Sequence, residues 1–563
     1  MRKYCLLVLV VCLVLSALVA HADSLDSLMG WPYNLPLTPG LNYSTWDPIG
    51  AQPIARRVNN LVYPVFGLPA LAEPGETIRV IVKYPNGAVY LNPQEWQVRL
   101  TTNFQNPFDA YAEVGDAVRQ NYDMTVFAVE YDMASSTYHL TCEVPWGAPE
   151  DLFSLMVATD DILDYQPACV KVLEEIGDTF TFAHLCDIQV DDVTGLALSN
   201  QLNNGAYPID GDKTSAEAVF ENQMLRELPL LNPDFALVTG DLVVGLHYES
   251  EIEYYVHISQ QTKVPLFMVP GNHDGYSYFN WTPSLQQDGE EYYARILGPL
   301  YYSFTVGPLH FVMINSYDGT PIRRSAGQMA VASPVDNWGG FLSEEQLGWI
   351  ARDLDEADEA GLTSMLFMHH DPRGPYTANK PYPTNPFLGD GSEYWNYESA
   401  EWDSNPYDTI SNETPQNNTG VKLMNLVKQH HVSHVFIGHN HFDQFWQFNT
   451  DDPIFDREGN PVGASITSAR PLTIVQTTTM SAGVDDPASY NGYRLMEVVE
   501  GYVQSINFIE NDEMRVQSVP GGNLWYEEIN NDGTSDDAMI TVINAMPTDL
   551  DVSLEFFTAG APN

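Results

Sequence analysis

Five short apolar segments of this chain are each followed directly by carboxylate, amide or imidazole side chains, and this arrangement strongly constrains the fold. In the clearest case, the apolar run 266–269 stops at a Pro-Gly pair and the triplet Asn272-His273-Asp274 follows. The polar groups after the other four segments are Asp187-Ile188-Gln189, Gly240-Asp241, His369-His370 and Gly438-His439-Asn440-His441. Short apolar runs bounded by turn residues predict buried strands. Because ligands bind beyond the carboxyl ends of strands in α/β sheets, we expect these groups to form one site.

Strand and helix patterns alternate between residues 175 and 510, which predicts an α/β layer with the sheet inside and helices outside. Thr214-x-x-Glu217 and Ser343-x-x-Gln346 each match the pattern of a capping box at a helix start. We expect helices over about 214–228, over 249–261 and after residue 343. Strands are expected at 179–186, 235–239, 266–269, 301–306, 309–314, 364–368 and 434–437.

The polar groups at these strand ends suit a pair of metal ions. Carboxylates, an amide oxygen and imidazoles together favour borderline divalent ions such as Mn²⁺, Fe²⁺ or Zn²⁺ over Ca²⁺. Asp241 could bridge two ions, and His439 and His441 could reach different ions. Two neighbouring ions can lower the pKa of a shared water and stabilise both oxygens of a displacement at phosphorus. Any one segment could be an ordinary polar strand end, but five together are hard to explain by chance.

These motifs resemble the pattern of the calcineurin-like metallophosphoesterase superfamily, which is D-x-H, G-D, G-N-H-[DE], H and G-H-x-H. The resemblance extends over about residues 179–508 and includes the sequences Tyr-Tyr-Ser-Phe and Gly-Pro-Leu-His-Phe-Val-Met-Ile-Asn within 301–315. It implies a four-layer αββα core, in which two facing sheets are flanked by helices. It also implies hydrolysis of a phosphodiester or a phosphomonoester, supported by two divalent metal ions.

The resemblance also implies a role for each site residue. Asp241 bridges the two metals and is a candidate catalytic residue with His273. His273 would stabilise the charge of the phosphate or protonate the leaving oxygen while a metal-activated hydroxide attacks. His370 has no ligand role in the family pattern and is expected to support a ligand. The implied metal ligands are Asp187, Gln189, Asp241 and His441 for the first ion, and Asp241, Asn272, His369 and His439 for the second.

One departure from the family pattern concerns Gln189, which stands where the first motif has histidine. An amide offers only a weak oxygen ligand, so we expect the first metal to bind loosely or to differ in identity. This departure keeps an alternative open, a metal-poor and catalytically weak cell-surface binding protein on a phosphoesterase scaffold. A third possibility is an enzyme for phospholipid head groups, which the aromatic-rich insertion at 371–420 could serve.

Basic residues are scarce, so the few near the motifs are candidates for binding a substrate phosphate. Arg373 follows His369-His370 closely and is the predicted substrate-binding residue. Arg323 and Arg324 lie in a first insertion, 316–340. Ion pairing with the abundant carboxylates is the simpler role for each arginine. We expect the second insertion to form an ordered rim over the site, because long loops inside compact domains are often functional.

The chain begins with the pattern of a signal peptide over residues 1–22. Arg2-Lys3 precede an apolar run over 6–20, and Ala20-His21-Ala22 supplies small residues for cleavage. We therefore expect an exported protein that is periplasmic, cell-surface or secreted, with no transmembrane segment after removal of the signal. A retained N-terminal anchor is the alternative. Residues 23–60, rich in Pro, Gly and Asn, form a lead-in.

The remaining segments are predicted to be β-rich. Alternating patterns at 77–82, 96–100, 138–144 and 152–159 predict an immunoglobulin-like β domain over 61–174, a candidate for contacts with a surface partner. The metallophosphoesterase domain should span 175–510. A C-terminal β segment, 511–563, should consist of a linker and a strand pair formed by 538–545 and 550–557.

Charge and cysteine content limit the partners and the compartment. The chain has 24 Lys and Arg against 75 Asp and Glu, a formal net charge of −51. Nucleic acid and anionic membranes both require a basic surface, so this balance argues against them. Three cysteines lie beyond the signal peptide. Cys142 and Cys169 could pair in an oxidising compartment, and Cys186 is expected to be a buried free thiol.

Overall fold

The structure is a computed structural model, and the residues it describes exclude 1–59 and most of the two insertions, 316–340 and 371–420. The described residues are 60–102, 121–190, 208–209, 213–214, 219–221, 223–245, 248–260, 262–278, 287–319, 324, 339–372, 393–396, 401–404, 419–441, 443–450, 454–455, 461–462, 470–482, 491–505, 507–510, 513–516, 519–520, 524–529 and 539–544.

The α/β part contains two six-stranded sheets within the described residues. In the first sheet, β9, β12 and β13 are parallel, and β26 runs antiparallel to β9. Its order is β13 (Leu266–Val269), β12 (Phe235–Thr239), β9 (Phe180–Leu185), β26 (Gly492–Val499) and β27 (Tyr502–Ser505), with β30 (Val519–Pro520) also beside β26.

The second sheet has a parallel centre and antiparallel edges. Strands β17, β18, β21 and β25 are parallel, and the edge strands β16 and β22 pair antiparallel to β17 and β25. The order is β16 (Tyr302–Val306), β17 (Leu309–Met313), β18 (Thr363–Phe367), β21 (Val432–Ile437), β25 (Pro471–Gln476) and β22 (Gln444–Asn449). The predicted hairpin of 301–306 and 309–314 is therefore confirmed as β16 and β17.

The two sheets face each other across a core of phenylalanine rings. Phe182 and Phe235 of the first sheet stack at 5.7 Å between centroids, and Phe367 and Phe436 of the second stack at 4.6 Å. Phe182 meets Phe311 edge to face at 5.8 Å, which joins the sheets. Offset-stacked and edge-to-face pairs add roughly 0.5–1.5 kcal/mol each beyond the burial of their area. This aromatic core holds the carboxyl ends of both sheets in a fixed relation.

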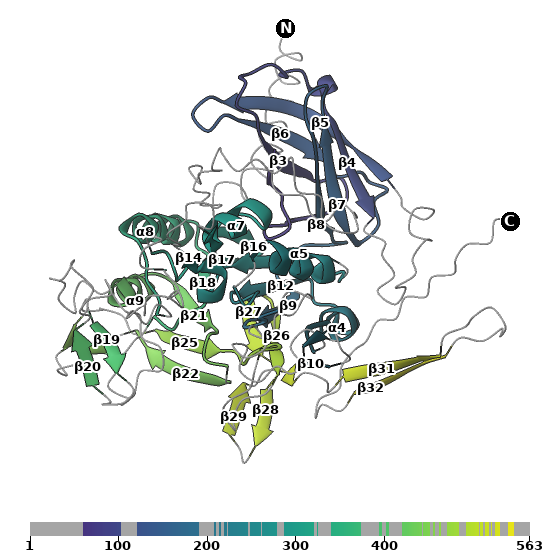
Figure 1. The fold of residues 1–563 in the computed structure, drawn as a ribbon. Helices are drawn as coiled ribbons and strands as arrows, with labels where there is room; N and C mark the ends of the chain where they lie inside the picture. Colours follow the sequence, from purple (N-terminus) through teal and green to yellow (C-terminus); the bar gives the residue numbers. More distant parts are fainter. Residues whose placement is uncertain are drawn as a thin grey trace, which may run out of the picture.

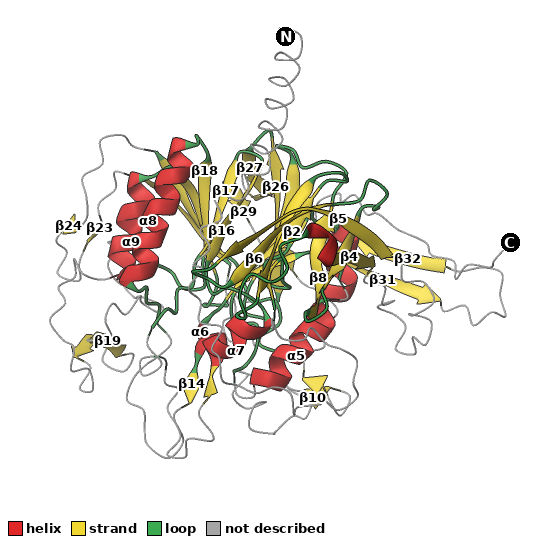
Figure 2. Cartoon of the chain, turned by 90° about the horizontal axis from the view of Figure 1, so that it is seen from above, coloured by secondary structure: helices red, strands yellow, loops and turns green. Residues whose placement is uncertain are grey.

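Helices cover the outer faces of both sheets. On the first sheet, α5 (Tyr248–Ser259) and α7 (Gly289–Ile296) share a buried cluster with the π-helical turn η4 (Gln223–Glu227) and α4 (Leu228–Leu231). On the second sheet lie α8 (Glu344–Glu359) and α9 (Thr419–Gln429), which Figure 2 shows side by side. Ser343 caps α8 as predicted, because its hydroxyl accepts the N–H of Gln346. The layers are helix, sheet, sheet and helix, in agreement with the predicted αββα core.

The N-terminal strands form one eight-stranded sheet within the described residues (Figure 1). They enclose a single buried core, and the strands predicted from alternation are present with shifts of one to two residues at their ends. The immunoglobulin-like assignment stays a prediction. The order is β1 (Leu61–Tyr63), β3 (Thr77–Lys83), β6 (Thr137–Glu143), β5 (Asn121–Asp132), β4 (Gln97–Thr102), β7 (Asp151–Ala158), β8 (Leu163–Val172) and β2 (Ala70–Ala72), with a 3-10 turn η2 (Pro93–Glu95) before β4.

The suggested pairing of Cys142 with Cys169 is wrong in this structure, because both are free thiols. Cys142 lies in β6 and Cys169 in β8, and β5, β4 and β7 separate these strands in the sheet. Both side chains are fully buried in the apolar core, and this burial raises the pKa of both thiols. Cys186 is also a buried free thiol, as predicted.

Several short antiparallel pairs lie outside the main sheets. The segment predicted as a strand at 538–545 is β32, and its partner is β31, which lies within the stretch predicted to be a linker. The other expected strand, 550–557, falls outside the described residues, as does the stretch between Thr214 and residue 219, where the first capping box was expected. The pairs are β10 (Pro208–Ile209) with β11 (Lys213–Thr214), β14 (Ser277–Tyr278) with β15 (Gln287–Asp288), β19 (Glu393–Asn396) with β20 (Glu401–Ser404), β23 (Ile454–Phe455) with β24 (Pro461–Val462), β28 (Asn507–Glu510) with β29 (Glu513–Val516), and β31 (Leu524–Ile529) with β32 (Met539–Asn544).

Among the helices of the described ranges, none has the length and apolarity needed to cross a membrane.

Candidate metal centre

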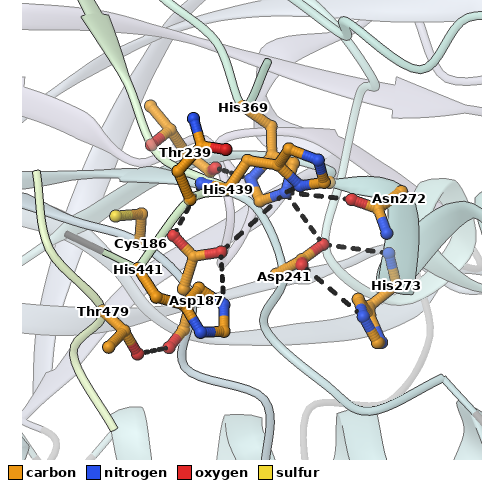
Figure 3. Close-up of polar contacts among 12 residues, drawn as sticks. Cys186, Asp187, Thr239, Asp241, Asn272, His273, His369, His439, His441 and Thr479 are labelled. Atoms are coloured by element: carbon orange, nitrogen blue, oxygen red, sulfur yellow. Dashed lines mark hydrogen bonds and ion pairs between the residues drawn. The ribbon is translucent and has the colours of Figure 1, made fainter. Parts of the chain in front are cut away.

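The predicted ligands meet at the carboxyl ends of five strands that belong to both sheets (Figure 3). Each ligand lies a few residues beyond the end of its strand, where the backbone hydrogen bonds of the sheet stop. There the side chains of the ligands point toward one another. Strands β9, β12 and β13 are parallel neighbours, and β18 and β21 are parallel neighbours in the facing sheet, so their ends converge. The residues brought together are Asp187, Gln189, Asp241, Asn272, His369, His439 and His441.

The group expected to hold the second metal surrounds Nε2 of His369. This nitrogen lies 3.1 Å from Oδ1 of Asn272, 3.2 Å from Oδ1 of Asp241 and 3.0 Å from Nδ1 of His439. The other ring nitrogen of His369 donates to the carbonyl of Thr239 at 2.7 Å. Because a carbonyl can only accept, Nδ1 donates its proton there, and Nε2 is the nitrogen that faces the ligand group and would bind a metal once it has lost its own proton.

The group expected to hold the first metal is more open. Oδ1 of Asp187 lies 3.3 Å from Nε2 of His441 and 3.9 Å from Nε2 of His369. This oxygen is buried and has no hydrogen-bond partner within the described part of the chain. Buried carboxylate oxygens are normally satisfied, so an unsatisfied one aimed at imidazoles fits a bound cation. The donor set and this oxygen together show that the residues present suit divalent metals.

Five candidate ligands have backbone conformations that ordinary side chains rarely adopt. The φ angles are 54° at Asp187, 49° at Gln189, 54° at Asp241, 74° at His439 and 55° at His441. A non-glycine residue in this left-handed region costs roughly 1 kcal/mol or more, and such strain concentrates at functional sites. Hydrogen bonds hold this backbone in place, since the N–H groups of 188 and 189 both donate to the carbonyl of Asp241 at 2.8 Å.

Two glycines allow the ligand loops to approach one another closely. A Cβ added to Gly271 would lie 2.2 Å from Oδ1 of Asp241. A Cβ added to Gly438 would lie 2.7 Å from Cβ of Cys186 and 2.8 Å from Oδ2 of Asp187. Any larger residue at either position would push a candidate ligand aside. The glycines of the G-N-H-D and G-H-x-H motifs therefore have a direct packing function here.

The electrostatics favour ionised carboxylates in this buried place. Burial raises the pKa of Asp187 and Asp241, but the neighbouring imidazoles outweigh burial and hold both pKa values below their usual range. Burial lowers the pKa of His439 to about 3, so its imidazole is neutral. Burial also acts to lower the pKa of His369, but Asp241 and Asp187 dominate and raise it to about 9. Metal binding at His369 would therefore displace a proton.

His273 lies at the edge of this group and is 25% exposed. Its backbone N–H donates to Oδ1 of Asp241 at 2.9 Å, and its Nδ1 donates to the carbonyl of Val244 at 2.7 Å. Nε2 then lies 3.9 Å from Oδ2 of Asp241. Nε2 of His273 thus faces the candidate metal centre from a partly exposed side chain, a position suited to an acid or a phosphate-binding group.

His370 adds a third imidazole to this part of the site. It is buried and lies 4.5 Å from His439 between ring centroids, and its Nδ1 shares a hydrogen bond of 2.8 Å with Oγ of Ser316. His369, His370 and His439 form one of the groups whose geometry could hold a metal, and Asp187, Asp241 and His369 form another. The predicted supporting role of His370 is compatible with this position.

The segment after β25 also shapes the site, and the sequence analysis missed it. The Thr479 hydroxyl donates to the carbonyl of Asp187 at 2.7 Å, and the Ser481 hydroxyl donates to the carbonyl of Ile188 at 2.7 Å. These bonds fix the loop that carries Asp187 and Gln189. The signal was present, because the polar run Gln-Thr-Thr-Thr-Met-Ser at 476–481 follows an apolar strand as the other motifs do.

Of the three candidate arginines, the structure describes Arg324, which forms ion pairs. Arg324 is buried and pairs with Asp288 at 2.7 and 3.0 Å and with Glu290 at 2.9 Å. Its charge is therefore compensated within the protein, as the ion-pairing alternative predicted. Arg373 and Arg323 lie outside the described residues, so the substrate-binding role of Arg373 stays a prediction.

Residues 180–443 match the family model of the calcineurin-like phosphoesterases. The resemblance inferred from the motifs is thereby confirmed, and the domain indicates metal-dependent hydrolysis of phosphoesters. No curated protein matches the chain. Among solved structures, an amylomaltase from Corynebacterium glutamicum is 10% identical, with 67% of this chain and 56% of that chain covered. Its TM-score of 0.13 carries no argument about fold or function.

Proposed function

We propose that this protein is an exported phosphoesterase that uses two divalent metal ions, Mn²⁺, Fe²⁺ or Zn²⁺, to hydrolyse a phosphodiester or a phosphomonoester. The supporting observation is the position of Asp241 between the two ligand groups. Its Oδ1 faces Nε2 of His369 at 3.2 Å, and its Oδ2 faces the amide of Gln189 at 3.1 Å. A carboxylate with one oxygen toward each group is placed to bridge two cations.

Each side chain has a task in this proposal. Asp187, Gln189 and His441 would complete the first metal position around Asp241, and Asn272, His369 and His439 would complete the second. Divalent ions at these positions would lower the pKa of a water and neutralise the charge of the phosphoryl group. The carboxylates are held ionised by their imidazole neighbours, and the strained loops hold the ligands close together before any substrate binds.

His273 would deliver the proton that the leaving oxygen requires. Its Nδ1 proton is committed to the carbonyl of Val244, so Nε2 is the nitrogen that can donate to a substrate. The backbone N–H of His273 is tied to Asp241, which fixes the distance between the imidazole and the metal positions. A positioned general acid contributes typically 10²–10⁴-fold in rate.

The test is ester hydrolysis by the mature protein after removal of its metals. The stripped protein is assayed with bis-p-nitrophenyl phosphate and with p-nitrophenyl phosphate, before and after Mn²⁺ is supplied. Asp241→Asn removes the bridging charge, and Asp123→Asn, at an exposed position of β5, is the matched control. We expect turnover that needs Mn²⁺, persists in the control and is lost in Asp241→Asn. The preferred ester separates a diesterase from a monoesterase.

Two other results would change the proposal. If two metals bind but neither ester is hydrolysed, the substrate is narrower than these esters. If no metal binds and no ester is hydrolysed, the catalytic proposal fails and the binding protein on a phosphoesterase scaffold is favoured. Metal content measured on the same samples separates these outcomes.

Export is proposed from the sequence of residues 1–22. The test is expression of the full chain in a host that recognises the signal, followed by N-terminal sequencing of the extracytoplasmic protein. We expect the mature chain to begin near Asp23. Recovery of the uncleaved chain in the membrane fraction would instead support the retained anchor.

A further inference from the structure

Tyr276 contacts a candidate metal ligand that lies four residues before it in the chain. Its hydroxyl accepts a hydrogen bond from Nδ2 of Asn272 at 2.7 Å. We propose that Tyr276 is a positioning residue, whose hydroxyl orients the Asn272 amide so that the amide oxygen faces the second metal. This inference rests on the metal positions of the proposed function and adds a determinant of metal affinity that is absent from the family's motif pattern.

The two ends of the Asn272 amide have different partners. Oδ1 of Asn272 lies 3.1 Å from Nε2 of His369, inside the ligand group, while Nδ2 points to Tyr276. Because the oxygen and the nitrogen stand on opposite sides of the amide carbon, a hydrogen bond at one end limits rotation of the whole amide. A half-turn of the amide would place its NH₂ group where a cation needs an oxygen. In the orientation observed, the hydroxyl of Tyr276 accepts from Nδ2 and holds the amide oxygen toward the ligand group, and a flipped amide would regain this bond only if the hydroxyl turned to donate to Oδ1.

The backbone of Tyr276 is held independently of its hydroxyl. Its carbonyl accepts hydrogen bonds from the Tyr248 hydroxyl at 3.0 Å and from the N–H of Gly289 at 2.9 Å. The next residue, Ser277, donates its N–H to the carbonyl of Arg324 at 2.9 Å. Removal of the hydroxyl alone should therefore leave the local backbone in place.

The ring of Tyr276 is also held by neighbouring rings. It lies 5.1 Å from His273 and meets Tyr317 edge to face at 6.1 Å. Tyr317 in turn stacks on His370 at 5.8 Å, and His370 lies 4.5 Å from His439. This continuous row of rings limits rotation of the Tyr276 side chain, so its hydroxyl stays at Asn272.

A double-mutant cycle on metal binding tests this role. Mn²⁺ binding is measured by equilibrium dialysis for the wild-type protein and for Tyr276→Phe, Tyr276→Leu, Asn272→Asp and Asn272→Asp/Tyr276→Phe. Tyr502→Phe, at an exposed position of β27, is the matched control for loss of a hydroxyl. Loss of a partner of a metal ligand typically weakens affinity 10–100-fold. We expect that loss at one of two sites in both the Phe and the Leu variants, and none in the control.

The aspartate background distinguishes orientation from packing. A carboxylate presents an oxygen to the metal in either orientation, so Tyr276→Phe should have little effect once Asn272 is Asp. A packing role predicts that Tyr276→Phe binds Mn²⁺ like the wild type while Tyr276→Leu does not, and this result would overturn the inference. If Tyr276→Phe weakens Mn²⁺ affinity equally with Asn272 and with Asp at position 272, the inference is overturned as well. If Tyr276→Leu does not fold, the double-mutant cycle of Tyr276→Phe and Asn272→Asp decides alone.

The inference and the proposed function fail separately. Mn²⁺ binding is measured without substrate, so a wild-type protein that binds two ions but hydrolyses no ester leaves the role of Tyr276 intact. Conversely, an active enzyme whose Tyr276→Phe variant binds Mn²⁺ normally refutes only this inference. A wild-type protein that binds no Mn²⁺ overturns both.

Discussion

The side-chain amide of Gln189 lies 3.1 Å from Oδ2 of Asp241, in the group expected to hold the first metal. In the sequence, Gln189 stands where the family pattern has a histidine, and its backbone is left-handed, with φ at 49°. The nitrogen and oxygen of this amide can exchange places by a half-turn. A bound cation would draw the oxygen inward, but an amide oxygen remains a weaker ligand than an imidazole.

Gln189→His should therefore tighten the first metal position. An imidazole offers a stronger ligand for borderline ions, and we expect at least a tenfold gain in affinity at one site. Titration of the metal-free protein with Zn²⁺ measures this gain, with Gln189→Ala as the matched loss of a ligand. Unchanged affinity in both variants would show that residue 189 does not contact the metal.

His273→Gln should slow hydrolysis in a way that depends on the leaving group. If His273 donates a proton, esters with poor leaving groups, such as alkyl phosphates, should lose about 10²–10⁴-fold in kcat. Esters of p-nitrophenol, whose leaving oxygen needs less help, should lose much less. Metal content should stay at the wild-type level, because His273 is not among the expected ligands. An equal loss for both leaving groups would assign His273 to phosphate binding instead.

Arg324→Ala should destabilise the fold much more than a comparable change at the surface. Arg324 is 4% exposed and pairs with the Asp288 carboxylate, which is 16% exposed, so its removal leaves this mostly buried carboxylate without its charge partner. Breaking such a pair typically costs about 3–5 kcal/mol. Arg99→Ala, which breaks the exposed pair with Asp123, should cost under about 1 kcal/mol. Urea unfolding measures both, and similar losses in the two variants would contradict the structural role of Arg324.

The sequence could predict the strands and the convergence of ligands because both follow from local patterns. The apolar runs at 235–239 and 266–269 are bounded by Pro and Gly, and they match β12 and β13 residue for residue. Parallel neighbouring strands bring their carboxyl ends to one edge of a sheet, so the approach of Asp187 to Asp241 follows from β9 and β12 alone. The approach of Asp187 to His441 also requires the two sheets to face each other, since β9 and β21 belong to different sheets.

The contacts made by individual side chains could not be predicted in the same way. The hydroxyl of Tyr276 reaches Asn272 only because a short helix, α6 (Asn272–Gly275), follows β13. Arg324 pairs with Asp288, which lies 36 positions before it in the chain. The separation of Cys142 from Cys169 depends on the strand order, which alternation alone does not reveal. These contacts depend on tertiary packing, and that information is not contained in short sequence windows.

Glu290 should make the stability of the fold fall as the pH rises. Burial raises its pKa from 4.5 to about 8, although Arg324 at 2.9 Å and the Asn315 amide at 2.7 Å oppose the rise. Between these values the folded protein keeps a proton that the unfolded chain has lost, so stability declines by up to about 1.4 kcal/mol per pH unit. Glu290→Gln should flatten the decline in urea unfolding at pH 5.5, 6.5 and 7.5 (about two units in all). Glu344→Gln, whose side chain is 76% exposed, should keep the wild-type slope, and parallel slopes in all three proteins would refute the assignment.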